Sequence, residues 1–202
     1  MIVEDNYAKI VSNNLDKIFS NPVDEMAVAL PASQKGRGIV FDAFGAKCRI
    51  QPDGIYLNDE KQTGVLGILI SLYALHAKPQ PSVLEPLKGF KDVPNSMPYV
   101  GAFATHTERI LVPHVEKIKS ASERITEELQ GQEAMTEVGG DFSFVVYPLP
   151  KIALCYIFYE SDEEFPASVR CLFSSNALNF MPIDALADVG EYTSKKIIQI
   201  IE

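Results

Sequence analysis

The chain has 202 residues, of which 47% are apolar and 22% are charged, and it contains three Cys and no Trp. This apolar fraction is typical of globular proteins and excludes a disordered or low-complexity chain. Because the net charge of −9 repels phosphate groups, we expect neither nucleic acid nor an anionic membrane surface as a partner.

The start of the chain and its apolar stretches indicate the compartment. Glu4 and Asp5 stand where a secretory signal would carry basic residues, and no long apolar run follows them. The most apolar stretch, residues 65–77, is shorter than the roughly 20 residues that span a bilayer. We therefore expect a cytoplasmic protein without a membrane span.

The first part of the chain predicts two helices and a small β-meander. Apolar residues recur at helical spacing over 6–19, and a second, short helix is expected within 23–32. Three strands are predicted after them, at 38–44, 46–50 and 55–57. Pro52-Asp53-Gly54 marks the turn between the last two strands.

A mostly apolar helix is predicted next, from Thr63 to about His76, and we expect it to be buried. His76 near its C-terminus suits the negative end of the helix dipole, which is a structural role. The following segment, 78–99, contains five prolines and no periodicity. This pattern predicts an ordered surface loop that is long enough to suggest a function.

In the second half of the chain, apolar residues that step by three and four predict one long helix over 112–129, with Pro113 in its first turn. A polar connection is expected over 131–140. Three strands and a final helix follow, at 142–147, 152–159, 168–173 and from Pro182 onward.

This order of elements predicts a single α+β domain over residues 1–202, with antiparallel β-meanders packed against four or five helices. Strands that alternate with helices would also fit a parallel sheet. The short connections between neighbouring strands disfavour that alternative.

The most distinctive segment is the acidic run between the last two strands, Glu160-Ser161-Asp162-Glu163-Glu164-Phe165-Pro166. Four carboxylates within five positions repel one another, so the run needs a cation, a basic partner or water. Three interpretations stay open: a solvated hairpin loop, a metal or cationic-ligand site, and a protein-docking loop. The Phe165-Pro166 bond is a candidate for a cis peptide.

The three cysteines, Cys48, Cys155 and Cys171, form no Cys-x-x-Cys pair, so no zinc knuckle or redox dithiol motif is visible. They are too few for the four thiolates of an iron–sulfur cluster, and no cofactor is evident. If the acidic hairpin folds symmetrically about Glu163, Cys155 faces Cys171 on a shared apolar face. We predict that these two side chains are neighbours in the core, either as reduced thiols or as a regulatory disulfide or shared metal site.

A few further residues are candidates for binding. Gly139-Gly140-Asp141 precedes a strand, which favours a tight turn with Asp141 as a cap or a ligand. His106 and Glu108 would coordinate a metal only if the chain is extended there, and Arg109 follows them. The sequence contains no glycine-rich nucleotide loop after a strand and no Gly-x-Ser-x-Gly nucleophile elbow.

Four motifs in the C-terminal third carry a resemblance to a known family. They are Gly140-Asp141-x-Ser143-Phe144, Leu149-Pro150-x-Ile152, Tyr159-Glu160-x-Asp162-Glu163-Glu164-Phe165-Pro166-Ala167-Ser168 and Leu172-Phe173. The chain resembles the uncharacterised family called domain of unknown function 3786, and the Asp-Glu-Glu-Phe-Pro run is the most specific stretch. Looser similarity extends from Tyr7 through Tyr99-x-x-Ala102-Phe103 and Glu108 to the final helix.

The resemblance implies a setting rather than an activity, because the family has none assigned. Its members come mainly from anaerobic bacteria and archaea, and some carry an iron–sulfur module of the kind found beside corrinoid proteins. The four-cysteine module is missing here, and Tyr159 stands where the family pattern often has Trp. The resemblance implies an iron–sulfur or corrinoid protein as a possible partner.

The leading hypothesis is therefore a binding or accessory protein in anaerobic redox or one-carbon metabolism. Its acidic hairpin and the 78–99 loop would form the recognition surface. A basic patch on a protein partner, or a cationic ligand, would complete the interaction.

A rival hypothesis is an enzyme in which Asp162, Glu163 or Glu164 binds a divalent cation or acts as a general acid or base. A cleft shared by these carboxylates and His106 or Arg109 would favour the enzyme, whereas an exposed hairpin would favour the docking protein. A third interpretation is purely structural, with Asp162 capping backbone N–H groups and Phe165 filling the core.

Overall fold

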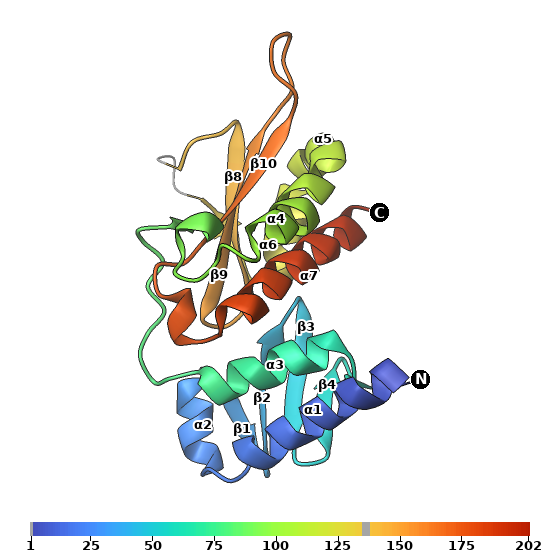
Figure 1. The fold of residues 1–202 in the computed structure, drawn as a ribbon, viewed down its shortest axis with the longest axis vertical. Helices are drawn as coiled ribbons and strands as arrows, with labels where there is room; N and C mark the ends of the chain where they lie inside the picture. Colours follow the sequence, from blue (N-terminus) through green and yellow to red (C-terminus); the bar gives the residue numbers. More distant parts are fainter. Residues whose placement is uncertain (1, 135–137) are drawn as a thin grey trace.

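The computed structural model describes residues 2–134 and 138–202, and its two halves are stacked along the long axis (Figure 1). The N-terminal half is residues 2–77 and the C-terminal half is residues 78–202. Each half contains one five-stranded sheet, and neighbouring strands in both sheets are antiparallel. The predicted α+β class with antiparallel meanders is confirmed.

Three helices and five strands make up the described N-terminal half. They are α1 (Ile2–Ile18), α2 (Val23–Ala29), β1 (Ser33–Lys35), β2 (Gly38–Ala43), β3 (Ala46–Gln51), β4 (Gly54–Leu57), β5 (Glu60–Lys61) and α3 (Val65–His76). The strands pair in chain order. Phe44-Gly45 and Asn58-Asp59 form tight hairpin turns, because both residues of each pair have positive φ.

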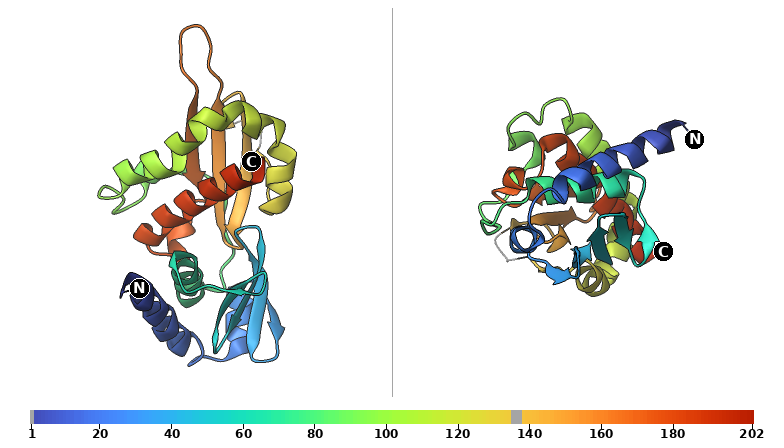
Figure 2. Two further views of the ribbon diagram at one scale, coloured as in Figure 1. Left: turned by 90° about the vertical axis from the view of Figure 1, so that its right-hand side faces the viewer. Right: turned by 90° about the horizontal axis from the view of Figure 1, so that it is seen from below.

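The predicted helices and strands of this half are confirmed, with ends that differ by a few residues. Helix α3 begins at Val65 behind Gly64, and no side chain caps it. Leu69, Ile70 and Tyr73 are completely buried, as expected for an apolar helix. Figure 2 shows α1 and α3 on the same side of the sheet.

The C-terminal half contains the second sheet and the helices that cover it. Its elements are β6 (Lys88–Gly89), η1 (Phe90–Asp92), α4 (Val100–Phe103), η2 (Ala104–Glu108), η3 (Arg109–His114), α5 (Val115–Ser120), α6 (Ser122–Glu128), β7 (Gln132–Glu133), β8 (Phe142–Leu149), β9 (Ile152–Tyr159), β10 (Ser168–Phe173), η5 (Ala177–Asn179) and α7 (Ile183–Ile201). The strand order is β6-β10-β9-β8-β7. The three long strands and the final helix are confirmed.

Two edge strands arise from segments that the sequence predicts as loops. Lys88–Gly89 forms β6 beside β10, and Gln132–Glu133 forms β7 beside β8. The 78–99 segment also buries Phe90 and Val93. Describing this segment as a surface loop is therefore wrong for its middle part, because two residues of backbone pairing leave no periodicity in the sequence.

The single helix predicted over 112–129 is also wrong. A 3₁₀ turn, η3, contains Pro113, and the helix that follows is broken at Ala121, where φ is −108° and ψ is 10°. Val115 and Ile118 on α5 are buried, and so is Ile125 on α6. The predicted apolar residues are buried as expected, but they lie on two short helices that meet at a bend instead of on one long helix.

The two faces of the second sheet are both covered. Side chains of Tyr156, Cys171 and Phe173 lie on the face that packs against the helices, in the main core. Cys155 lies on the opposite face, in a smaller cluster beneath Leu84 and Leu87.

The predicted contact between Cys155 and Cys171 is therefore wrong. Leu172 pairs with Cys155, and Cys171 pairs with Tyr156, which shifts the register by one residue from a hairpin symmetric about Glu163. A shift of one residue moves every side chain to the other face of a strand. The two thiols consequently lie on opposite sides of the sheet.

Hydrogen bonds join the two halves. The N–H of Phe44 donates to the carbonyl oxygen of Pro148 at 2.7 Å, and the N–H of Lys151 donates to the hydroxyl of Tyr73 at 3.1 Å. One main hydrophobic core runs through both halves, from Val11 to Ile200. The assignment of a single domain stays a prediction, and this shared core supports it. Within the described residues, no helix is both long enough and apolar enough to cross a membrane.

Candidate functional site

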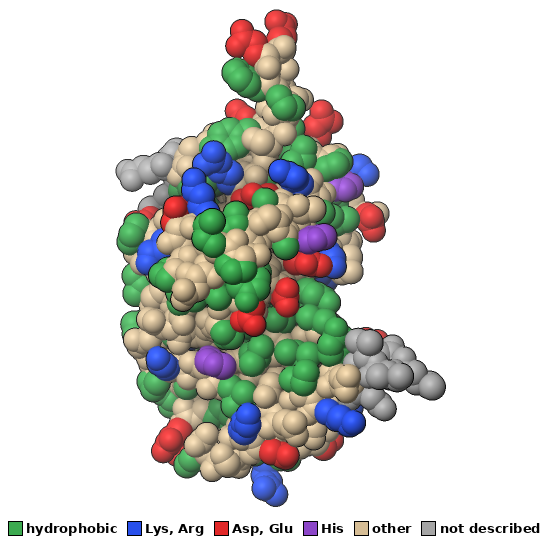
Figure 3. Space-filling view, viewed as in Figure 1, with side chains coloured by type: hydrophobic (Ala, Val, Ile, Leu, Met, Phe, Trp, Pro, Cys, Tyr) green, Lys and Arg blue, Asp and Glu red, His purple; other side chains and the backbone are tan. Residues whose placement is uncertain are grey.

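The acidic run forms a long loop that stands clear of the molecule. We call residues 160–167, which join β9 to β10, the acidic arm. Residues 161–166 are all exposed, and the arm projects beyond the body in two perpendicular views (Figures 1 and 2). Figure 3 shows acidic side chains at its outer end. The arm is therefore a protruding surface element.

Asp162 fixes the turn of the arm. Its Oδ1 accepts hydrogen bonds from the backbone N–H groups of Phe165 at 2.7 Å and Glu164 at 2.8 Å. Its own N–H donates to the carbonyl oxygen of Phe165 at 3.0 Å. The N–H groups of Phe165 and Glu164 hold the pKa of Asp162 below its usual value, because they stabilise the ionised form. The structural interpretation of Asp162 as a cap for backbone N–H groups is confirmed.

Phe165 does not fill the core. Its side chain is 65% exposed at the end of the arm. The Phe165-Pro166 bond is trans, since the cis bond in the described residues is Glu85-Pro86. Both expectations for this pair are wrong, because the turn is closed by Asp162.

Two residues outside the arm hold its base. The carboxylate of Asp141 accepts a hydrogen bond from the N–H of Glu160 at 2.7 Å, although the two residues are 19 positions apart in the sequence. The carboxylate of Glu160 is paired with the ammonium group of Lys119 on α5. The hydrogen bond that Lys119 donates to Glu160 raises the pKa of Lys119. Asp141, Glu160 and Asp162 are thus all engaged within the molecule.

Glu163 and Glu164 differ from the other acidic residues. Within residues 2–134 and 138–202, no ion pair or side-chain hydrogen bond engages either carboxylate. Together with Phe165 they make up the free tip of the arm. Two carboxylates and one aromatic ring are therefore presented to solvent on a loop whose turn is fixed.

A small hollow lies between the base of the arm and the helices. Its volume is about 370 Å³. It is lined by Val112, Pro113, Val115, Glu116, Lys117, Glu160, Ser161 and Ala167.

The residues His106, Glu108 and Arg109 are placed elsewhere. His106 and Glu108 belong to the π-helical turn η2, so the extended chain needed for a shared metal is not present. The carboxylate of Glu108 accepts a hydrogen bond from the N–H of Cys171 at 3.0 Å, and burial raises its pKa. His106 and Arg109 are exposed. Glu108 binds the edge of β10 and Asp162 binds the turn of the arm, so the two carboxylates do not share a cleft.

The described side chains do not form the clustered set of ligands that a bound metal ion needs. Across the described part of the chain, no three side chains of His, Cys, Asp or Glu are grouped so that they could hold a metal ion. The carboxylates of the arm are spread between its turn, its base and its tip.

Sequence reasoning missed Lys119 and the role of Glu108. Lys119 lies 41 residues before Glu160, and Glu108 lies 63 residues before Cys171. No spacing in a single sequence connects such pairs, because the packing of α5 and η2 against the sheet creates them.

Comparison with protein families finds one match that covers most of the chain. The model described as "Domain of unknown function (DUF3786)" matches residues 22–196. A comparison with curated proteins finds no match. A comparison with solved structures finds none either.

Proposed function

The chain belongs to the DUF3786 family, whose description assigns no activity, and we propose that it is a cytoplasmic binding protein that docks onto a protein partner through its acidic arm. The proposal extends the setting that the family resemblance implies, which is anaerobic redox or one-carbon metabolism. An iron–sulfur or corrinoid protein is the partner class that this setting favours.

One observation carries the proposal. Asp141, Asp162 and the Lys119–Glu160 pair hold the arm in place, while Glu163, Glu164 and Phe165 remain exposed at its tip. A loop that is already ordered loses less conformational entropy when it binds. Acidic residues at the base and in the turn therefore hold the arm, and two glutamates and one phenylalanine are left available at its tip.

The chemistry of the tip defines the partner surface. Two adjacent carboxylates repel each other, and a cationic surface relieves that repulsion. An exposed aromatic ring gains most when it enters an apolar pocket at the centre of an interface. We infer that the partner offers Lys or Arg residues around an apolar pocket. Complementary charge would also speed the encounter and make it sensitive to salt.

The 78–99 segment is the second proposed part of the recognition surface. Most of its large apolar side chains are at least partly covered, but Met97 is 79% exposed. Methionine side chains adapt to different apolar surfaces, which suits a contact area at the margin of an interface.

The experiment compares affinity purification with two charge-reversed baits under anoxic conditions. E163K/E164K reverses the tip of the arm, and D16K/E25K makes the same change in net charge at exposed positions in the N-terminal half. We expect at least one co-purifying protein to bind the wild type and D16K/E25K but to be lost at least tenfold with E163K/E164K. Purified partner and each bait are then measured by calorimetry.

Two outcomes would overturn the docking function. Equal capture by wild type and E163K/E164K would show that the arm is not the docking element. A stoichiometric metal or ligand mass in native mass spectrometry of the anoxically purified protein, lost in E163K/E164K, would move the assignment to a ligand site or an enzyme. Thermal unfolding of each variant shows that it is folded.

A further inference from the structure

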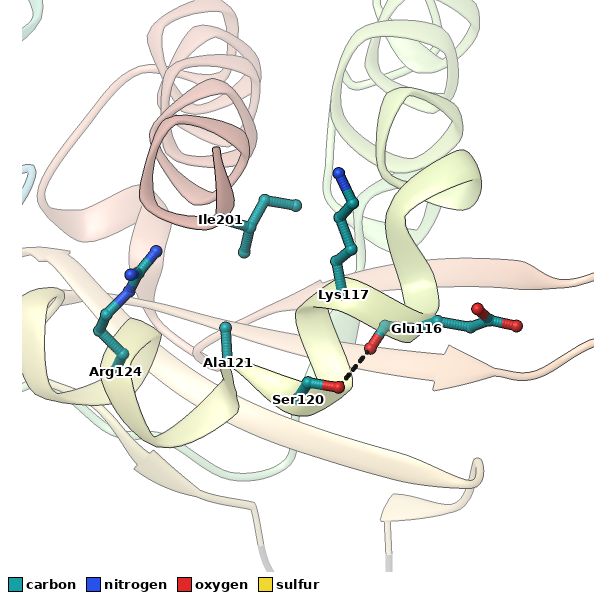
Figure 4. Close-up of a pocket in the computed structure, with 6 residues that line it drawn as sticks. All are labelled: Glu116, Lys117, Ser120, Ala121, Arg124 and Ile201. Carbon is teal, nitrogen blue, oxygen red and sulfur yellow. Dashed lines mark hydrogen bonds between the residues drawn. The ribbon is translucent and has the colours of Figure 1, made fainter.

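A second feature at the same end of the molecule is a cationic hollow. It lies where α5, α6 and the C-terminal end of α7 meet, and its volume is about 510 Å³ (Figure 4). It is lined by Glu116, Lys117, Ser120, Ala121, Arg124 and Ile201. The bend at Ala121 opens it, because the helix axis changes direction there.

Two of the three charged side chains that line this hollow are basic. Lys117 and Arg124 lie on either side of Ile201 in Figure 4. Neither forms an ion pair with any residue of the described chain. The carboxylate of Glu116 points away from Ile201 and Arg124. The backbone carbonyl oxygen of Glu116 accepts a hydrogen bond from the Ser120 hydroxyl at 3.0 Å. In a chain of net charge −9, two cations that form no ion pair, one on each side of the hollow, are suited to an anionic group.

The floor of the hollow is apolar. Ala121 and Ile201 are partly buried and lie between the two cations. The hollow thus combines two positive groups with an apolar surface. The tip of the acidic arm combines two negative groups, Glu163 and Glu164, with the exposed ring of Phe165.

The hollow and the tip cannot meet within one molecule as the arm is held. Asp141 and Lys119 fix the base of the arm, which projects away from α5 and from the C-terminus (Figure 1). Both features nevertheless lie at the same end of the chain's long axis. In a two-fold dimer, a contact between the tip of one copy and the hollow of the other is repeated by symmetry, and such a self-complementary contact closes on itself.

We propose that the cationic hollow receives the acidic arm of a second copy of this chain in a two-fold dimer. Glu163 and Glu164 pair with Lys117 and Arg124, and Phe165 packs on Ala121 and Ile201. The inference rests on the proposed function, since it also uses the arm as the docking element, and it names a second copy as one of its partners.

The test measures the mass of the full chain in solution by analytical ultracentrifugation, over a wide range of concentration and at low and high salt. We expect the wild type to dimerise and its dissociation constant to rise at high salt, because exposed ion pairs are screened. E163K/E164K and K117E/R124E should each weaken the dimer at least tenfold. The control D16K/E25K should dimerise like the wild type.

Mixing the two weakened variants makes the test sharper. In the mixture, each Lys-bearing tip faces a Glu-bearing hollow, and each Glu-bearing tip faces the native Lys117 and Arg124. Both contacts of the heterodimer are then complementary, so we expect mixing E163K/E164K with K117E/R124E to restore the dimer. The chain that combines all four substitutions should also dimerise.

Each contrary result has a separate meaning. A wild type that stays monomeric at high concentration and low salt overturns the dimer, while the docking function still stands if E163K/E164K loses a captured partner. A dimer that none of these variants weakens uses another surface and also overturns the inference. If phosphate raises the melting temperature of the wild type but not of K117E/R124E, and no dimer forms, then the hollow binds small anions instead.

Discussion

The carboxylate of Glu108 accepts a hydrogen bond from the backbone N–H of Cys171 at 3.0 Å, just beyond the part of β10 that pairs with β6. The short strand β6 pairs only with Leu172 and Phe173. A side chain from the π-helical turn η2 therefore completes the edge of the sheet. π-Helical turns are rare, and here the turn positions one carboxylate against the sheet.

Removing this acceptor should destabilise the protein. In E108A the partly buried N–H of Cys171 loses its acceptor, which costs about 1–3 kcal/mol of unfolding free energy. In E108Q the amide oxygen can still accept, so the loss should be smaller. Urea denaturation of both variants at neutral pH measures the difference. Equal stability of E108A and wild type would contradict this role.

Glu108 should also make stability depend on pH. Burial raises its pKa in the folded state above the ordinary value of 4.5. Between the ordinary and the raised pKa the folded state holds a proton that the unfolded state has lost, so this group's contribution to stability falls as the pH rises through that window. E108Q cannot titrate. The unfolding free energy of wild type minus that of E108Q should therefore decline as the pH rises through that window, whereas a constant difference would refute the effect.

Asp162 should control the order of the arm rather than the stability of the fold. Its pKa is lowered by the N–H groups of Phe165 and Glu164, so their hydrogen bonds weaken as the pH falls through that lowered value. In D162A the amide hydrogens of Glu164 and Phe165 should exchange faster, while D162N, which keeps an acceptor oxygen, should be closer to wild type. Hydrogen exchange followed by NMR measures this. A large change in global unfolding would show that the arm contributes to the core.

The three thiols should be unreactive in the folded protein. Cys48, Cys155 and Cys171 are all buried. Burial raises the pKa of Cys48 to about 12 and that of Cys155 to about 11, and it raises that of Cys171 as well. Thiolate is the reactive form. Titration with a disulfide reagent should detect three thiols in denaturant and no rapid reaction in buffer, and oxidation should not link Cys155 to Cys171.

A side chain at Gly140 should destabilise the fold more than one at Gly139. It has a φ of +82°, and an added Cβ would lie 2.5 Å from Ile157 Cγ2 and 2.8 Å from the carbonyl oxygen of Phe158. Gly139 has a similar φ of +85° but meets nothing closer than 3.9 Å, which makes it a matched control. G139A should cost about 1–2 kcal/mol for the left-handed backbone. G140A should cost roughly 1–3 kcal/mol more for the contacts. Equal losses in urea denaturation would show that the contact with β9 is relieved cheaply.

The sequence predicts the elements whose residues carry a local signal, such as a turn motif or a periodic apolar pattern. It does not predict features that depend on contacts between distant parts of the chain. Pro52-Asp53-Gly54 marks a turn by its own conformational preferences, and the β3–β4 turn is there. The β9–β10 hairpin pairs Tyr159 with Ser168, which centres the loop between Glu163 and Glu164 rather than on Glu163. A symmetric loop and one shifted by a single residue have the same apolar pattern, because β9 is buried on both faces. The faces of Cys155 and Cys171 could not be assigned without that detail.

Only part of the candidate site could be predicted from the sequence. The acidic run itself is visible in the sequence, and so is the turn that places Asp141 before β8. The division of its carboxylates into those that hold the arm and those that face solvent requires the positions of Lys119 and of the backbone N–H groups. These positions depend on how α5 packs beside the sheet.

The attachment of the arm has a consequence for how this protein could change over evolutionary time. The ladder between β9 and β10 closes at the pair Tyr159 and Ser168, and Glu160 anchors the arm just beyond it. Residues 161–166 lie outside both the ladder and the core. Insertions or exchanges there leave strand register untouched, as loop tips generally allow. The sequence of the tip can thus diverge between relatives, or be transplanted between them, without redesign of the scaffold.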